Sequence, residues 1–218
     1  MKLTVIRAFD LSDAWYRCVR AIQEEGYLWT IQRGSFVGHQ RLEFDNVNIT
    51  IQHPSNRPLI PDVPEGVPPP TSQRMVDEYL ALLMTPEKGD YQYTYGERIS
   101  SQLFQTIEIL KKTPMTNQCT IEIGQPSDIN IEHPPCLRLI DCRIRYGKLH
   151  FFVYFRSWDL WSGLPPNLAG IQMVKEWMGQ QIGVEDGTLN AWSKGLHLYD
   201  FQFEHAKNLI KSRKKLIK

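Results

Sequence analysis

The chain has 218 residues, of which 42% are hydrophobic and 22% charged, and its formal net charge is +1. A chain of this length can bury a large apolar core without metals or disulfides, so we expect one domain spanning residues 1–218. The balanced charge excludes a global electrostatic field that would recruit nucleic acid or an anionic membrane.

The N-terminal half predicts three helices and one strand. Apolar residues recur at helical spacing in Leu11–Glu25, Thr71–Leu83 and Ser100–Lys112. Apolar and polar residues alternate over residues 47–51, which is typical of a strand. The segment Pro54–Pro70 is rich in proline and lacks periodicity, which indicates a surface connection within one domain.

The C-terminal half first predicts strands. Cys119–Ile123 is typical of a buried strand. Leu137–Arg145 and Leu149–Arg156 are two further strands, and the turn at residues 146–148 joins them into a hairpin. Helices mixed with antiparallel strands indicate an α/β chain of the α+β type.

Two helices complete the chain. Pro165 and Pro166 begin a helix that runs through Gln181, with Asn167 as its expected N-cap and Gly183 as its glycine stop. The last helix covers Asp200–Leu216, and basic residues continue to the end of the sequence. Positive charge complements the C-terminal end of a helix dipole, and we favour this interpretation over a nucleic-acid patch.

The four cysteines show no zinc-type spacing, so we expect reduced thiols, a cytoplasmic protein and no metal site. No apolar run suits a signal peptide or a membrane-spanning helix. Cys136 differs from the other cysteines because it follows two prolines and opens a strand. Arg156 ends the partner strand, and a nearby cation favours a reactive thiolate. A buried inert cysteine is the competing interpretation.

A run of motifs between Pro134 and Tyr199 resembles the thymidylate synthase family: PPC, GKL, FRSWD, GLPPN and HLY, in that order. The match extends loosely upstream through YTYGER and the helix that carries Glu78. The short length and the FRSWD form look most like compact archaeal-type members and pyrimidine hydroxymethylase relatives. This resemblance implies a layered sheet with surrounding helices, and a homodimer.

The resemblance also implies a role for each site residue. Cys136 would attack C6 of the pyrimidine and make C5 nucleophilic towards a one-carbon unit. Methylenetetrahydrofolate or a related reduced pterin would supply that unit. Arg156 and Ser157 would contact the 5′-phosphate, and His197 and Tyr199 would hold the sugar 3′-hydroxyl. Asn167 would hydrogen-bond the edge of the uracil base, and Asp159 would lie near the base and the folate. Glu78 would organise proton transfer around the base, and Tyr95 would line the pocket beside the nucleophile.

Several of these residues have a plainer interpretation. Glu78 would be an exposed helix carboxylate, and Tyr95 a core residue. Asn167 would serve only as a helix cap, and His197 with Tyr199 would only pack a turn. The motif around Arg156 argues against a mere surface cation.

Four features depart from the family pattern. The segment Thr116–Gln118 lacks the arginine pair that the partner subunit usually supplies. Leu137 replaces a histidine and Phe155 a glutamine, and we find no counterpart of the C-terminal tail that closes over substrate and folate. We expect Arg33 or Arg41 to replace part of the lost phosphate contacts.

The sequence therefore predicts one-carbon transfer to C5 of a pyrimidine nucleotide. Methylation of dUMP is the first hypothesis, and hydroxymethylation is the second. A nucleotide-binding homologue without turnover is the competing hypothesis. Loss of the arginine pair and the tail favours it, and the retained Cys136, Arg156, Asn167, His197 and Tyr199 oppose it.

Overall fold

The computed structural model describes residues 1–216, and the side chains are described up to residue 213. The final two residues of the predicted basic end, Ile217 and Lys218, lie outside the described part. Within it the chain forms a six-stranded sheet, a four-stranded sheet and five α-helices. The predicted α+β class is confirmed.

The larger sheet has the strand order β1-β4-β9-β7-β6-β5. The pairs β1–β4 and β7–β9 are parallel, and the other neighbours are antiparallel. The strands of this sheet are β1 (Leu3–Ala8), β4 (Asn46–Ile51), β5 (Thr120–Glu122), β6 (Leu137–Arg145), β7 (Lys148–Phe155) and β9 (Glu185–Ser193).

The smaller sheet has the order β2-β3-β10-β8. Its strands are β2 (Tyr27–Thr30), β3 (Gln40–Glu43), β8 (Trp158–Asp159) and β10 (Leu196–Tyr199). Two residues separate β7 from β8, so the chain passes from the larger sheet directly into an edge strand of the smaller sheet.

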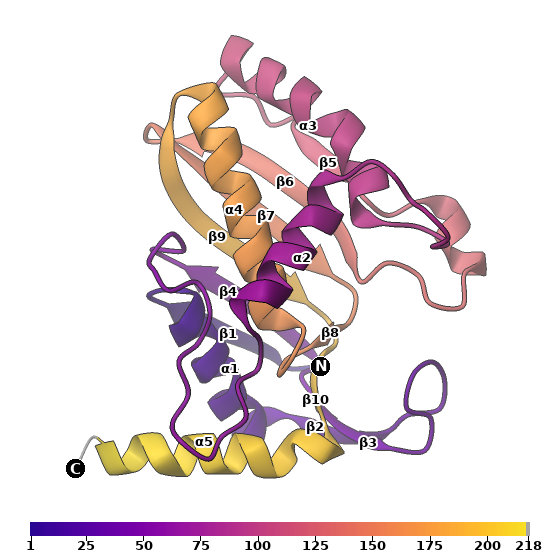
Figure 1. Ribbon diagram of the computed structural model, residues 1–218, viewed down its shortest axis with the longest axis vertical. Helices are drawn as coiled ribbons and strands as arrows, with labels where there is room; N and C mark the ends of the chain where they lie inside the picture. Colours follow the sequence, from indigo (N-terminus) through magenta and orange to yellow (C-terminus); the bar gives the residue numbers. More distant parts are fainter. Residues whose placement is uncertain (217–218) are drawn as a thin grey trace.

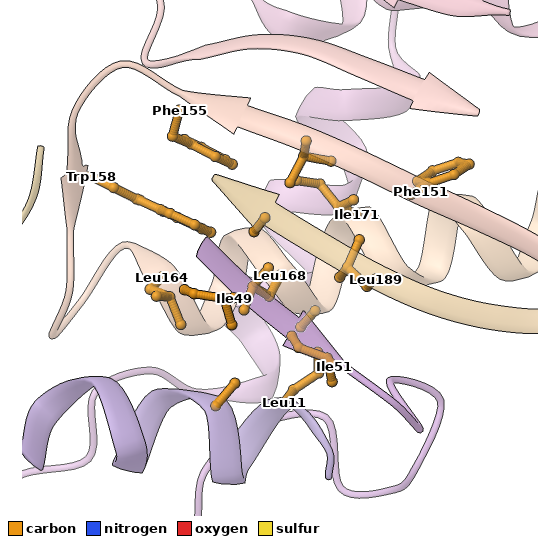
Figure 2. Close-up of a cluster of buried hydrophobic side chains, with 14 of the residues drawn as sticks. Leu11, Ile49, Ile51, Phe151, Phe155, Trp158, Leu164, Leu168, Ile171 and Leu189 are labelled. Carbon is orange, nitrogen blue, oxygen red and sulfur yellow. The ribbon is translucent and has the colours of Figure 1, made fainter. Parts of the chain in front are cut away.

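Helices α1, α3 and α4 pack against the larger sheet, α2 packs on α4 and α3, and α5 lies away from this sheet beside α1 (Figure 1). The helices are α1 (Leu11–Glu25), α2 (Gln73–Met84), α3 (Tyr95–Lys112), α4 (Leu164–Ile182) and α5 (Phe203–Leu216), with short 3₁₀ helices η1 (Pro126–Asn130) and η2 (Asp200–Gln202). Figure 2 shows how α4 contributes Leu168 and Ile171 to a core shared with Phe151 of β7 and Leu189 of β9.

The other face of the larger sheet carries exposed apolar side chains. Phe152 of β7 is 40% exposed and Trp192 of β9 is 49% exposed. Leu3 and Val5 of β1 are more than half exposed. Strand side chains alternate between faces, and these four residues lie opposite the strand residues that are buried under the helices.

Most of the predicted elements are confirmed. Helix α1 has the predicted bounds, because the Asp10 side chain accepts from the Asp13 amide and caps its first turn. Strand β4, strand β5 and the β6–β7 hairpin lie where the sequence places them. The segment between β4 and α2 contains no helix or strand, as expected.

Four helix starts differ from the prediction. Helix α5 begins at Phe203 rather than Asp200, because Asp200–Gln202 form the 3₁₀ helix η2. Helix α3 begins five residues earlier, at Tyr95, because Thr94 and Glu97 form a capping box. Helix α2 begins at Gln73 after the Ser72 cap. Helix α4 begins at Leu164, so the prediction that Asn167 is its N-cap is wrong: Gly163 holds that position, and the Asn167 amide already donates to the Gly163 carbonyl.

The end of helix α4 is as predicted. Gly183 has a φ of 85°, the left-handed conformation that glycine adopts without strain, and its amide donates to the Gly179 carbonyl. Strand β9, a central strand of the sheet, was not predicted. In the described part of the chain no helix is long and apolar enough to cross a membrane.

Candidate active site

A cavity of about 830 Å³ lies beside the open end of the β6–β7 hairpin. Its wall is built from distant parts of the sequence, because β3, β10 and η1 converge on the turn before β6. The predicted site residues that line it are Arg33, Arg41, Cys136, Arg156, Ser157 and Tyr199. The structure therefore brings six of the eleven predicted residues to one cavity.

Arg156 fixes the turn that presents Cys136. Its Nε donates to the Pro135 carbonyl at 3.1 Å, and its Nη2 donates to the Pro134 carbonyl at 2.6 Å. The Arg156 amide also donates to the Cys136 carbonyl at 2.9 Å. These bonds hold the two prolines against the end of β7, and the thiol consequently opens into the cavity.

Cys136 is the only partly exposed cysteine; the other three are buried, and all four lie in the described part of the chain. Burial raises the pKa of the Cys136 thiol, and the charges of Arg156 and Arg138 oppose that rise. Burial also raises the pKa of the Cys18 and Cys142 thiols, which face no cation that lowers it. Cys136 is therefore the best placed of the four to act as a nucleophile.

Tyrosines surround the thiol on its helix side. The Tyr95 hydroxyl accepts from the Leu137 amide at 3.3 Å, and its pKa is raised by burial and by the neighbouring Cys136. Burial, with a further contribution from the neighbouring Cys136, also raises the pKa of the Tyr79 and Tyr93 hydroxyls. The Tyr79 hydroxyl is buried and has no hydrogen-bond partner within the described residues.

A second cavity of about 390 Å³ adjoins the first, since Tyr93 and His133 line both. Most of its wall is aromatic, and its residues are Tyr79, Leu82, Tyr91, Gln92, Tyr93, Thr94, Tyr95 and His133. Tyr95, which the sequence places beside the nucleophile, thus lies between the thiol and this aromatic cavity.

Cations gather at the end of the larger cavity that is formed by the loop after β2, β3 and the residues just before β10. Arg33, Arg41 and Lys194 line it together with Ser157. Arg41 forms an ion pair with Glu43, whose Oε2 lies 2.8 Å from Arg41 Nη2. The alignment falls short of a hydrogen bond, and Glu43 Oε2 and Arg41 Nε are both buried without a hydrogen-bond partner in the described part of the chain.

His197 lies behind this end of the cavity and is 3% exposed. Burial lowers its pKa to about 4, so the ring is neutral at pH 7. In that form Nδ1–H donates to the Gly195 carbonyl at 2.8 Å, and Nε2 is an acceptor without a partner in the described residues. The ring packs edge-on against Tyr199, with 4.7 Å between the centroids.

Asp159 and Asn167 do not line the cavity. The Asp159 carboxylate accepts from the amides of Trp161 and Ser162, and burial raises its pKa. The Asn167 Oδ1 accepts from the Trp158 indole Nε1 at 2.9 Å. Oδ1 is thus engaged, and the side-chain NH₂ is the other polar group of this amide.

The structure does not bring Glu78 to the site. Its side chain is 59% exposed, and it forms an i,i+4 ion pair with Arg74 on α2. The plainer interpretation of this residue, an exposed helix carboxylate, describes its observed position. Its neighbour Tyr79 is the α2 residue that faces Cys136.

Two departures from the family pattern are accommodated in the core. Leu137 is fully buried. Phe155 is 1% exposed and stacks on Trp158, with 3.8 Å between ring centroids and an interplanar angle of 4°. Both therefore contribute to packing rather than to the cavity wall.

Sequence reasoning missed several residues in or near the cavity wall. Asp128, Glu43 and Lys194 line the cavity, and Arg138 lies two positions after Cys136 on β6. Only the short spacing from Cys136 to Arg138 could have been found in the sequence. The others approach through the fold. In the described part of the chain, no group of three or more His, Cys, Asp or Glu side chains is arranged to hold a metal ion.

Comparison with known proteins adds two findings. A family model described as thymidylate synthase matches residues 75–217. A protein of Methanosarcina acetivorans whose name proposes a thymidylate synthase is 31% identical over 217 residues, with 95% of this chain and 94% of the relative covered.

Further relatives differ in coverage. A protein of Methanothermobacter thermautotrophicus with the same proposed name is 26% identical and matches over 94% of this chain and 98% of its own length. A thymidylate synthase of Listeria monocytogenes is 30% identical over 122 residues, which are 56% of this chain and 38% of that protein.

Proposed function

Because the chain belongs to the thymidylate synthase family, we propose that it transfers a one-carbon unit to C5 of a pyrimidine nucleotide through a covalent adduct of Cys136 at C6. The first candidate reaction is methylation of dUMP to dTMP. The observation that carries the proposal is that Cys136, Arg156, Ser157, Arg33 and Tyr199 line one cavity.

The chemistry begins when the Cys136 thiolate forms a bond from Sγ to C6 of the base. The electrons of the C5–C6 double bond then move towards C5 and O4, which makes C5 nucleophilic. C5 bonds to the one-carbon unit and loses its proton to water, while the bond between that unit and its donor breaks. A hydride from the donor would complete a methyl group, and water would complete a hydroxymethyl group. When the S–C6 bond breaks, the double bond returns and the thiolate is regenerated.

In this proposal the remaining side chains bind different parts of the nucleotide. Arg156 and Ser157 bind the phosphate with help from Arg33 or Arg41, since all four line the cavity. The neutral His197 accepts a sugar hydroxyl at Nε2, its unpartnered nitrogen. Asn167 donates its free NH₂ to O4 of the base.

The aromatic cavity fits the one-carbon donor. Flat rings of Tyr79, Tyr91, Tyr93 and Tyr95 suit a pterin, and the orphaned Tyr79 hydroxyl offers a polar contact to a ring edge. Methylenetetrahydrofolate or a related reduced pterin would supply the one-carbon unit and, for methylation, a hydride. This cavity adjoins the larger cavity that Cys136 lines, so the placement brings the donor near C5.

We also propose that the protein is a cytoplasmic homodimer. Four free cysteines suit a reducing compartment. The open face of the larger sheet exposes Phe152, Trp192, Leu3 and Val5, an apolar surface that a second copy would cover. Glu78 has no part in this proposal, because its observed position lies outside the cavity.

Heat protection by nucleotides tests the proposal. Bound ligand stabilises the folded protein, so a panel of dUMP, UMP, dCMP, CMP and deoxyuridine ranks the substrates directly. We expect dUMP to raise Tm most. The mass of the product formed with a reduced folate then separates methylation from hydroxymethylation. Protection by none of these compounds would contradict the proposal, and protection without product would identify a binding homologue.

A further inference from the structure

An ion cluster made of Arg98, Asp128 and Arg138 stands beside the nucleophile. Arg98 binds Asp128 through both guanidinium ends, Nη1 to Oδ2 at 2.9 Å and Nη2 to Oδ1 at 2.8 Å. Arg138 Nη1 donates to Asp128 Oδ2 at 2.7 Å, and the Gln125 amide donates to the same oxygen at 2.9 Å. Four hydrogen bonds therefore fix one carboxylate, and the carboxylate fixes Arg138.

Burial separates the three members of this cluster. The side chains of Asp128 and Arg98 are 3% and 7% exposed, whereas Arg138 is 24% exposed. Arg98 also donates to the Ile123 carbonyl, and its guanidinium lies over the Tyr93 ring. Two guanidinium charges against one carboxylate leave one positive charge in excess, on the side where Arg138 lies.

A β-bulge aims Arg138 at this position. The β6–β7 register shifts between Leu137 and Leu139, so Arg138 is the extra residue of β6. The amides of Ile123 and Gly124 both donate to the Arg138 carbonyl. A Cβ on Gly124 would lie 2.5 Å from Arg138 Nη2, so a larger residue there would displace the guanidinium from this position.

We propose that Arg138, tethered by Asp128, is a positioning residue for the nucleophile: its fixed positive charge favours the thiolate form of Cys136. The proposal rests on the proposed role of Cys136. Arg156 is the other cation near the thiol, and its guanidinium also holds the carbonyls of Pro134 and Pro135. Arg138 supplies a second cation two positions after the thiol, on β6.

The surroundings of the thiol support this assignment. Burial raises the pKa of Cys136, and the opposing charges are those of Arg156 and Arg138. The other titratable or charged groups near it are Tyr79, Tyr93 and Tyr95 on its helix side, Tyr199 from β10, Asp128 from η1, and Glu132 and His133 from the segment before the prolines. The tyrosines are neutral at pH 7, because their pKa values are raised above 10.0. Asp128 is neutralised by the cluster.

The test is the pH profile of Cys136 alkylation by iodoacetamide in the whole chain without nucleotide, followed by mass spectrometry of the Cys136 peptide. Arg138→Gln removes the charge and keeps a hydrogen-bond donor for Asp128. We expect its profile to move about one pH unit upwards, with about tenfold slower alkylation near pH 7.5. Arg138→Met should give the same shift if it folds, as judged by thermal melting.

Two variants separate charge from shape. Arg138→Lys keeps the charge and should stay within about twofold of the wild-type rate. Arg143→Met removes a cation from the same strand but from the open face, and should leave the profile unchanged. A wild-type profile in folded Arg138→Gln, or equal slowing in Arg138→Lys, would overturn the proposal. Alkylation needs no turnover, so this result is independent of whether the proposed reaction occurs.

Discussion

Two carboxylates line the same cavity in opposite states. Asp128 accepts four hydrogen bonds, chiefly from Arg98, and these lower its pKa to about 2. Glu43 is also paired with an arginine, Arg41, yet burial outweighs that pairing and raises its pKa above the usual value. The sign of the shift depends on how many hydrogen bonds compensate for lost water.

The two carboxylates mark two kinds of region: a scaffold around Asp128, whose polar groups are already hydrogen-bonded, and a receptive site around Glu43, whose polar groups lack partners. Around Asp128 the hydrogen-bonding groups of the cluster are satisfied, so the nucleophile end is organised before any ligand binds. Around Glu43 the structure leaves buried atoms without partners, namely Glu43 Oε2, Arg41 Nε and His197 Nε2. Buried polar atoms without partners are costly, and a nucleotide's sugar and phosphate would satisfy them.

The largest expected effect comes from removing the scaffold carboxylate. Asp128→Ala leaves Arg98 buried without its partner, and breaking such a pair costs about 3–5 kcal/mol. Urea denaturation at pH 7 measures the loss. Asp62→Ala, at an exposed position, is the control and should change stability by less than about 0.5 kcal/mol. A loss below about 1 kcal/mol for Asp128→Ala would show that the cluster is not a scaffold.

The contribution of Asp128 has a defined pH window. Its pKa is lowered on folding, so the carboxylate stabilises the protein fully above the ordinary pKa of 3.8 and loses this effect as pH falls towards about 2. The stability difference between wild type and Asp128→Asn should therefore be constant between about pH 5 and 7 and shrink below about pH 4. A difference that grows on acidification would contradict the assigned sign.

The next effect concerns ligand binding at the receptive end. Arg33 lines the cavity and is exposed. Arg33→Gln should weaken dUMP binding about tenfold, since a charge-assisted contact is partly screened by water and salt. Deoxyuridine, which lacks the phosphate, should bind Arg33→Gln and wild type equally. Calorimetry with both ligands decides, and Arg20→Gln on the outer face of α1 is the control. Equal weakening of both ligands would remove Arg33 from the phosphate site.

The smallest effect is expected for Glu43→Gln. A raised pKa means that the charged form is disfavoured in the folded state, so Glu43 costs stability at neutral pH and ceases to do so once acid protonates it. The variant should gain up to about 1 kcal/mol at pH 7, and the gain should vanish near pH 4. Glu24→Gln is the surface control. A clear loss of stability at pH 7 would make Glu43 a scaffold residue like Asp128.

The sequence predicted the elements whose characteristic residues lie within the element itself. Helix α1 carries its cap and apolar stripe in its own sequence, and the β6–β7 hairpin carries its turn. Strand β9 was not predicted because its buried side includes the small residues Gly187, Ala191 and Ser193, which weaken the alternation of apolar and polar residues. They lie in the sheet that α4 covers, and that context is absent from a nine-residue window.

The site follows the same rule. Two prolines, Cys136 and Arg156 form a unit that the sequence displays within one hairpin. Asp128 reaches Arg98 across 30 positions and Arg138 across 10, so the cluster exists only in the folded chain. Glu78 was predicted at the site, but its side chain lies on the exposed side of α2 and Tyr79 faces the cavity instead. The sequence of a helix does not tell which of two neighbouring residues its packing turns towards the cavity.

Release of the C5 hydrogen tests the central claim most directly. With dUMP tritiated at C5 and a reduced folate donor, the wild-type protein should release tritium to water, because C5 must lose its proton after Cys136 bonds to C6. Cys136→Ala should release none while still binding dUMP, and Cys119→Ala, at a buried thiol, should retain release. Tritium release by Cys136→Ala at the wild-type rate would contradict the account.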